Sequence, residues 1–285
     1  MVETRHVFGG VHNMQYLFIL FLTIISFDVF AQDVLAVGQK HEGEKNYIEA
    51  EKSYRKAFFE GDPKGALYLY DLNKNGFITT DDADDMKRIG LKLLHKNAEE
   101  GDASAALDLG HYYLFGKYLK GDYKNAHRYF MLAYQRGKPM AAYRLGMSYL
   151  DGLYHNINAN KAMYYMDYAS NSGIGRASRQ IAIAYHLGIG KSKDLDKAIE
   201  YYTKAAIEGE GLAMRDLANI YNHEIKNPTL HEKWLLEAVK FDVSDAHYML
   251  GAFYKSLDPK KSKYHYMQAV VMKHHLSRIE IYGDY

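Results

Sequence analysis

The sequence predicts an all-α protein whose fold is an α/α superhelical solenoid of stacked helix pairs. The first observation is a helix signal, A-x-x-LG-x-x-Y, that returns every 36 residues along much of the chain. The central pairs of this signal are Leu109-Gly110, Leu145-Gly146, Ile181-Ala182 and Leu217-Ala218. The second observation is an Ala-x-x-x-Gly ending that keeps the same register. A fixed period of this length is typical of repeats that bury their apolar faces by stacking on their neighbours.

The second half of each repeat is expected to be a helix that ends at a glycine. An alanine is followed seven residues later by another alanine, and four residues after that by a glycine. These positions are Ala126, Ala133 and Gly137, then Ala162, Ala169 and Gly173, then Ala198, Ala205 and Gly209. Alanines seven residues apart share one helix face and let a neighbouring helix approach closely. The glycines are predicted to be helix C-caps.

The repeat array is expected to fill residues 32–285 with about six to seven helix pairs. The same alanine and glycine spacing at Ala50, Ala57 and Gly61 places its start near residue 33. Downstream, the motif continues with shortened spacing, as a terminal capping repeat would. The solenoid is therefore predicted to occupy the whole chain after its first 31 residues.

Residues 1–31 are predicted to be a secretory signal peptide. The apolar run Leu17–Ile25 is followed by Val-Phe-Ala before Gln32, which is typical of a signal peptidase site. The run is too short for a membrane-spanning helix of ~20 residues, so no integral span is expected after cleavage. The mature protein is expected in the periplasm or outside the cell. An uncleaved N-terminal anchor is the alternative, and Met14 is an alternative start to Met1.

Composition narrows the kinds of partner. The 36 basic and 35 acidic residues interleave and give a net charge of +1, so no basic stripe is available for a phosphate backbone and nucleic acid is not expected. There is no cysteine, which excludes a disulfide framework. The 27 tyrosines are unusual in number. Those outside the repeated position, such as Tyr112, Tyr143 and Tyr248, are predicted to serve a partner surface.

Two adjoining stretches resemble the Sel1-like repeat family, relatives of the tetratricopeptide repeat. They read AAYRLGMSYLDGLYHNINANKAMYYMDYASNSGIGRA and SRQIAIAYHLGIGKSKDLDKAIEYYTKAAIEGEGLA. The resemblance covers about residues 35–275 and implies a right-handed superhelix used for protein–protein contact. Some cysteine-rich members of the family have been linked to β-lactam hydrolysis. This chain departs from that branch because it has no cysteine.

One turn resembles a calcium-binding loop. The interval from Leu69 to Leu109 is longer than the repeat, and we expect five extra residues in the turn over residues 71–82. This segment matches the pattern D-x-[DN]-x-[DN]-G, with aspartate instead of glutamate at the last position. The predicted ligands are Asp71, Asn73, Asn75, the carbonyl of Phe77, Thr79 and Asp82. Weak calcium binding, at ~10⁻⁴–10⁻³ M, is one interpretation, and a polar turn bent at Asn75-Gly76 without an ion is the other.

The first helices are expected to line a binding groove. If the repeated alanine, leucine, glycine and tyrosine face the stack, the residues beside the leucine project away from it. The predicted groove residues are Asp108, His111, Arg144, Met147, Arg179, Gln180, His186, Arg215, Asp216 and Asn219. Their mixture of charged, amide and apolar groups suits an extended peptide or a partner's helix, and the alternative is that they are merely solvated.

The function predicted from these observations is that of an exported, non-catalytic scaffold that binds a protein or peptide. The alternative is a hydrolase acting on β-lactam or cell-wall material, as in the cysteine-rich relatives. An enzyme of that kind needs a nucleophile beside a base, and no motif in the sequence places such a pair.

Overall fold

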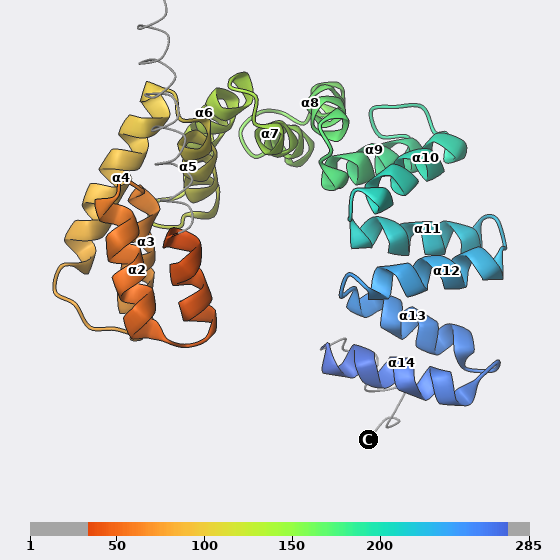
Figure 1. Cartoon of the computed structure of the whole chain (residues 1–285). Helices are drawn as coiled ribbons and strands as arrows, with labels where there is room; N and C mark the ends of the chain where they lie inside the picture. Colours follow the sequence, from red (N-terminus) through yellow and green to blue (C-terminus); the bar gives the residue numbers. More distant parts are fainter. Residues whose placement is uncertain (1–33, 273–285) are drawn as a thin grey trace, which may run out of the picture. The chain divides into compact units, whose positions relative to one another are not determined.

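The computed structural model describes residues 34–272, and this part of the chain is helical without strands (Figure 1). It divides into two compact units, one ending at Asp122 and the other beginning at Tyr123. The predicted signal peptide, residues 1–31, lies outside the described residues. No helix in residues 34–272 is long and apolar enough to cross a membrane.

The first unit contains a helix over residues 34–43 and four further helices. These are α2 (Tyr47–Phe59), α3 (Pro63–Lys74), α4 (Ala83–Glu100) and α5 (Ala103–Phe115). The second unit contains α6 (Tyr123–Gln135), α7 (Pro139–Asp151), α8 (Ala159–Asn171), α9 (Gly175–Leu187), α10 (Leu195–Ile207), α11 (Gly211–His223), α12 (Pro228–Val239), α13 (Ser244–Tyr254) and α14 (Pro259–Val271). Within each unit, every helix from α2 onward packs on the next one in sequence. The predicted α/α solenoid fold is confirmed.

The glycines that follow the second helices end them as predicted. Gly173 has φ +83°, and its N–H donates to the carbonyl of Ser170 at 3.0 Å. The next N–H, of Ile174, donates to the carbonyl of Ala169 at 3.0 Å. This pair of hydrogen bonds is a Schellman motif, and it recurs at Gly137 and Gly209. A left-handed backbone favours glycine, so each repeat turns into the next in the same way.

The turns inside the repeats are built alike as well. Each first helix of the three central repeats ends at a glycine in the left-handed region: Gly116, Gly152 and Gly188. The last residue of each turn then donates its N–H to the carbonyl of the repeated tyrosine. The donor and acceptor pairs are Asp122 and Tyr113, Asn158 and Tyr149, and Asp194 and Tyr185.

Small residues let the helix axes approach as the alanine spacing predicted. Ala162 and Ala169 on α8 are fully buried. On the facing helix, a Cβ added at Gly146 would lie 2.8 Å from Cε of Met166 and 3.1 Å from the carbonyl of Ala162. Contacts this short require the neighbour to move, so the position favours glycine.

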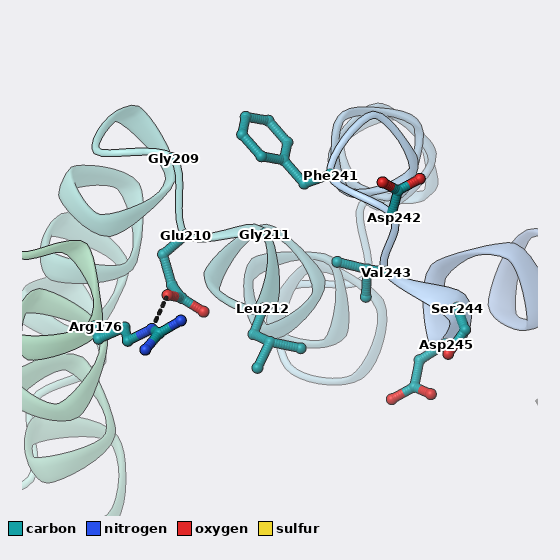
Figure 2. A pocket seen from close by; sticks show the side chains of 10 residues that line it. All are labelled: Arg176, Gly209, Glu210, Gly211, Leu212, Phe241, Asp242, Val243, Ser244 and Asp245. Atoms are coloured by element: carbon teal, nitrogen blue, oxygen red, sulfur yellow. Dashed lines mark ion pairs between the residues drawn. The ribbon is translucent and has the colours of Figure 1, made fainter. Parts of the chain in front are cut away.

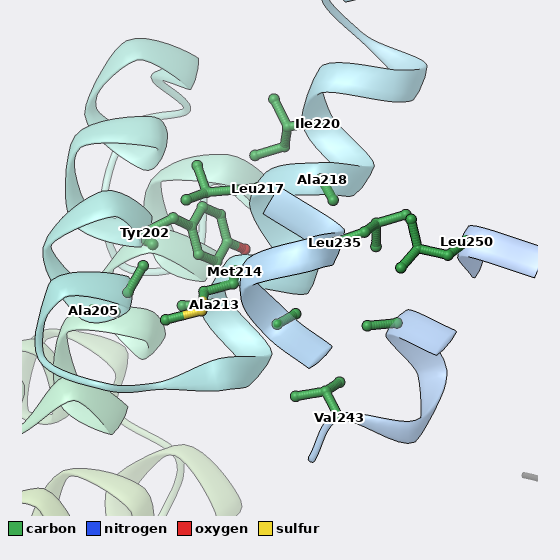
Figure 3. Packing of buried hydrophobic residues seen from close by; sticks show 14 of the residues in the cluster. Tyr202, Ala205, Ala213, Met214, Leu217, Ala218, Ile220, Leu235, Val243 and Leu250 are labelled. Carbon is green, nitrogen blue, oxygen red and sulfur yellow. The ribbon is translucent and has the colours of Figure 1, made fainter. Parts of the chain in front are cut away.

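One large core of the second unit extends from α9 to α13 (Figure 3). Leu217 and Leu235, from the two helices of one repeat, are fully buried, and Leu250 joins them from the next repeat. Tyr202 contributes its ring from the preceding repeat. Each repeat therefore completes the core of its neighbours, which is how stability is carried along a solenoid. In a separate core, Tyr143 is mostly buried, so most of its ring packs within the repeats rather than on the partner surface that we expected.

The five extra residues of the second repeat do not enlarge its turn as expected. They lengthen α4, which has 18 residues where α6 has 13. The turn itself covers residues 75–82, because Asp71 and Asn73 belong to α3. The longer helix begins with Asp84 and Asp85, whose charge favours a helix N-terminus, and buries Ala83 and Met86 on its inner face.

Candidate functional site

The predicted groove residues lie on the first helices of the repeats, and all ten are half-buried. Asp108 and His111 are on α5 in the first unit, where Nζ of Lys64 lies 3.8 Å from Oδ2 of Asp108. The other eight belong to the second unit. Arg144 and Met147 are on α7, Arg179, Gln180 and His186 on α9, and Arg215, Asp216 and Asn219 on α11.

In the second unit, the structure joins three of these residues into a line of ion pairs. Asp216 accepts from Nε of Arg179 at 2.7 Å and from Nη2 of Arg215 at 2.9 Å. Arg215 also donates through Nη1 to Asp245 of α13 at 2.7 Å. The line therefore crosses three successive first helices, α9, α11 and α13. His186 is paired separately, with Nε2 2.7 Å from Oε1 of Glu224.

Two adjoining pockets open beside this line. The smaller, of about 270 Å³, is lined by Tyr143, Arg176, Arg179, Gln180, Glu210 and Leu212. The larger, of about 420 Å³, lies between the α10–α11 turn and the α12–α13 turn (Figure 2). It is lined by Arg176, Gly209, Glu210, Gly211, Leu212, Phe241, Asp242, Val243, Ser244 and Asp245. Arg176 and Glu210 form an ion pair of 3.7 Å where the two pockets meet.

The larger pocket combines apolar walls with an excess of carboxylates. Phe241 is 47% exposed and Leu212 is 38% exposed, so both present apolar surface to the pocket. A Cβ added at Gly211 would lie 2.8 Å from both Phe241 and Val243. Because glycine has no side chain, these two residues can pack directly against the start of α11. Of the three carboxylates that line the pocket, Glu210 is paired with Arg176, Asp245 is paired with Arg215 of the ion-pair line, and Asp242 is the third.

Arg176, Glu210 and Phe241 were not among the predicted residues, although the sequence holds one signal for Phe241. It stands immediately before Asp242, and Asp242 takes the left-handed position, φ +55°, that glycine holds in the preceding repeats. The residues at the position of Phe241 in those repeats are Arg136, Ser172 and Glu208. An aromatic residue where the repeat otherwise has a polar one indicates a use outside the core.

In the first unit, the residues predicted to bind calcium have other interactions. Asp71 accepts a hydrogen bond from the hydroxyl of Tyr118, and Nζ of Lys117 lies 3.0 Å from Oδ2 of the same carboxylate. Asn73 accepts the backbone N–H of Thr80 through its side-chain oxygen at 3.0 Å. The first two expected ligands of the loop are thus tied to neighbouring protein groups.

Asp82 is held by Arg55 of α2 through both of its oxygens, at 2.8 and 3.1 Å. The hydrogen bonds from Arg55, together with one from Thr80, lower the pKa of Asp82 to about 2. Asn75, Phe77 and Thr79 are exposed. Calcium binding at residues 71–82 stays a prediction, and an ion would have to compete with these interactions. Across residues 34–272, no cluster of three or more His, Cys, Asp or Glu side chains is placed to hold a metal ion.

One serine contacts a lysine, which bears on the hydrolase alternative. Ser170 accepts from Nζ of Lys204 at 2.9 Å and lies 2.8 Å from the hydroxyl of Ser178. Ser178 in turn donates to Glu208 at 2.6 Å. Ser170 is 1% exposed and Ser178 is fully buried, so a substrate has no approach to either hydroxyl. The cluster ties α8, α9 and α10 together and has a structural explanation.

Stacked helix pairs with a polar first-helix face define a repeat protein of the α/α solenoid class. Three segments match the Sel1 repeat, at residues 103–138, 139–174 and 176–210. The chain therefore carries three Sel1 repeats, and proteins built from this repeat are generally scaffolds for protein interactions. No curated protein matches the chain in sequence.

Solved structures of similar fold include other Sel1 repeat proteins. A Sel1 repeat protein from Oxalobacter formigenes is 21% identical, with a TM-score of 0.66, and the match covers 83% of this chain and 99% of that one. The protein c5321, a protective antigen present in uropathogenic Escherichia coli strains displaying an SLR fold, is 20% identical, with a TM-score of 0.59. That match covers 89% of this chain but only 56% of c5321. At these identities the likeness shows the fold alone.

Proposed function

We propose that this protein is an exported scaffold that binds a segment of a partner protein along the first helices of its second unit. The observation that carries the proposal is the pair of adjoining pockets beside the line of ion pairs. Side chains already fixed by their neighbours lose little freedom when a partner binds, so such a surface is preorganised. In the larger pocket Glu210 is paired with Arg176 and Asp245 with Arg215, and the further carboxylate of Asp242 favours a partner segment that carries a basic group beside an apolar side chain.

The test uses the mature protein, immobilised and exposed to a cell-envelope extract of the source organism. The captured partner is identified, and its binding segment is then measured as a synthetic peptide by fluorescence anisotropy. Phe241→Ser should weaken peptide binding at least tenfold, because it removes the aromatic wall of the pocket. Ile207→Ser is the matched control, since Ile207 is 81% exposed and is not a lining residue of either pocket. Equal loss in both variants would overturn the proposed site.

Export is the second part of the proposal, and the run Leu17–Ile25 with its Val-Phe-Ala ending supports it. Mass spectrometry of the native protein should find an N-terminus at Gln32. An intact terminus at Met1 or Met14 would contradict cleavage.

A further inference from the structure

Two histidines from separate elements of the second unit face each other through the same ring atom. His127 is on α6, and His155 lies in the turn between α7 and α8. Their Nε2 atoms are 3.3 Å apart, and the ring planes are inclined at 83°. Neither the repeat register nor the proposed partner surface accounts for this pairing.

The separation fits two ligands of one tetrahedral metal ion. A Zn²⁺–N bond of ~2.0–2.1 Å gives an N···N edge of ~3.3–3.4 Å in a tetrahedron. A hydrogen bond between two neutral imidazoles is the competing explanation for the same distance, with one ring donating and the other accepting. The two explanations differ in what added metal does.

The surroundings hold both rings in place. Tyr149 stacks on His155 with ring centres 5.1 Å apart and planes 9° apart, and His127 meets the same tyrosine edge-on at 5.9 Å. Nδ1 of His127 is buried without a hydrogen-bond partner among the described residues, so the polar contact of this ring is made by Nε2. Burial lowers the pKa of His127 to about 4, with His155 and Lys161 adding to the effect.

We propose that His127 and His155 form a binding site for a divalent transition-metal cation of the Zn²⁺, Ni²⁺ and Cu²⁺ class, with water completing the coordination. Imidazole nitrogen suits these ions, whereas Mg²⁺ and Ca²⁺ prefer oxygen ligands. Two protein ligands make a site of modest affinity. Lys161 weakens it further, because its ammonium lies over the Tyr149 ring at 5.4 Å from the centroid and opposes a second cation nearby.

The experiment is titration of the untagged, metal-free mature protein with zinc chloride at pH 7.5, followed by calorimetry and by the shift in melting temperature. Binding of one Zn²⁺ is expected at this site, with Cu²⁺ binding more tightly and Mg²⁺ not at all. His155→Gln should abolish the binding, and His127→Gln should do the same. Lys161→Gln should tighten Zn²⁺ binding several-fold at low salt. A variant that had merely lost its fold could not bind Zn²⁺ more tightly.

Two control variants separate this site from other histidines. His186→Gln removes an imidazole paired with Glu224 on another repeat, and it should leave the Zn²⁺ titration unchanged. The double variant His274→Gln/His275→Gln removes the adjacent pair near the C-terminus and should also leave it unchanged. No Zn²⁺ effect on the parent protein would overturn the proposal, and so would binding that survives His155→Gln. Either result would leave the contact as a hydrogen bond between imidazoles.

Discussion

The hydroxyl of Tyr118 donates a hydrogen bond to the carboxylate of Asp71, joining the turn after α5 to α3, two helices earlier in the first unit. Tyr118 has φ +64°, a conformation that is costly for a bulky side chain. Gly190, at the same distance after its helix-ending glycine, has φ +67°. The tyrosine thus occupies a position suited to glycine, and its contact with Asp71 offsets the strain.

Replacement of Tyr118 should show how much that contact contributes. Tyr118→Phe keeps the ring but removes the donor, so we expect the free energy of unfolding to fall by about 1–2 kcal/mol. Equilibrium urea unfolding measures the change. Tyr154→Phe is the matched control, because Tyr154 is more exposed, and it should have little effect. A Tyr118→Phe variant as stable as the parent would mean that the hydrogen bond does not form in solution.

Calcium binding at residues 71–82 can now be tested with a variant that favours it. If the segment binds calcium, a tenfold excess over Kd raises the free energy of unfolding by about 1.4 kcal/mol. Arg55→Gln should strengthen the effect, because it releases Asp82 from its guanidinium partner. Melting curves with millimolar calcium and with magnesium measure both. If neither the parent nor Arg55→Gln responds, the segment is a polar turn without an ion.

Gly146 should not tolerate a larger side chain. Gly146→Leu overpacks the contact with Met166 and should destabilise the protein by ~1–3 kcal/mol or more, with a broader unfolding transition because the repeats uncouple. Gly43→Ala is the control, since nothing lies within 4 Å of a Cβ added there. Urea unfolding of both variants makes the comparison, and an unchanged Gly146→Leu midpoint would contradict the packing shown here.

Acid should destabilise the last helix pair, α13 and α14, because it contains two buried histidines. Nδ1 of His247 on α13 lies 3.0 Å from Nδ1 of His265 on α14, and each residue is 7% exposed. Burial lowers the pKa of His265 to about 4, with His247 and Lys261 adding to the effect, and burial also lowers the pKa of His247 despite the nearby Asp242.

The unfolded chain, with an ordinary histidine pKa of about 6.5, therefore binds more protons than the folded one between pH 6.5 and 4. The contribution of these two histidines to the free energy of unfolding should be constant above pH 6.5, and it should fall as the pH is lowered from 6.5 to 4. Urea midpoints from pH 8 to pH 4 measure the dependence. His265→Gln should reduce the slope without abolishing it, because the pKa of His127 is also lowered to about 4 and contributes in the same window. An unaltered slope in this variant would show that other groups are responsible.

Local features of the sequence predicted most of the fold. The left-handed turns at Gly137 and Gly173 and the close contact at Gly146 depend on short-range backbone sterics and on the absence of a side chain. A repeat makes such features visible, since the same requirement returns at a fixed spacing. The ten groove residues were placed on the first helices for the same reason, although their role in binding stays a prediction.

The candidate sites depend on contacts between residues far apart in the chain, which the repeat spacing does not predict. Asp71 was predicted to face an ion, but it contacts Tyr118, which lies 47 residues away along the chain. His127 meets His155 because the turn between α7 and α8 brings His155 towards α6. Phe241 forms a pocket wall because it lies in the turn between α12 and α13. The sequence by itself determined the helices, their caps and their order, because these follow from interactions within a few residues. Only the tertiary structure decided which side chains meet, because that depends on the rotation of each helix and the course of each turn.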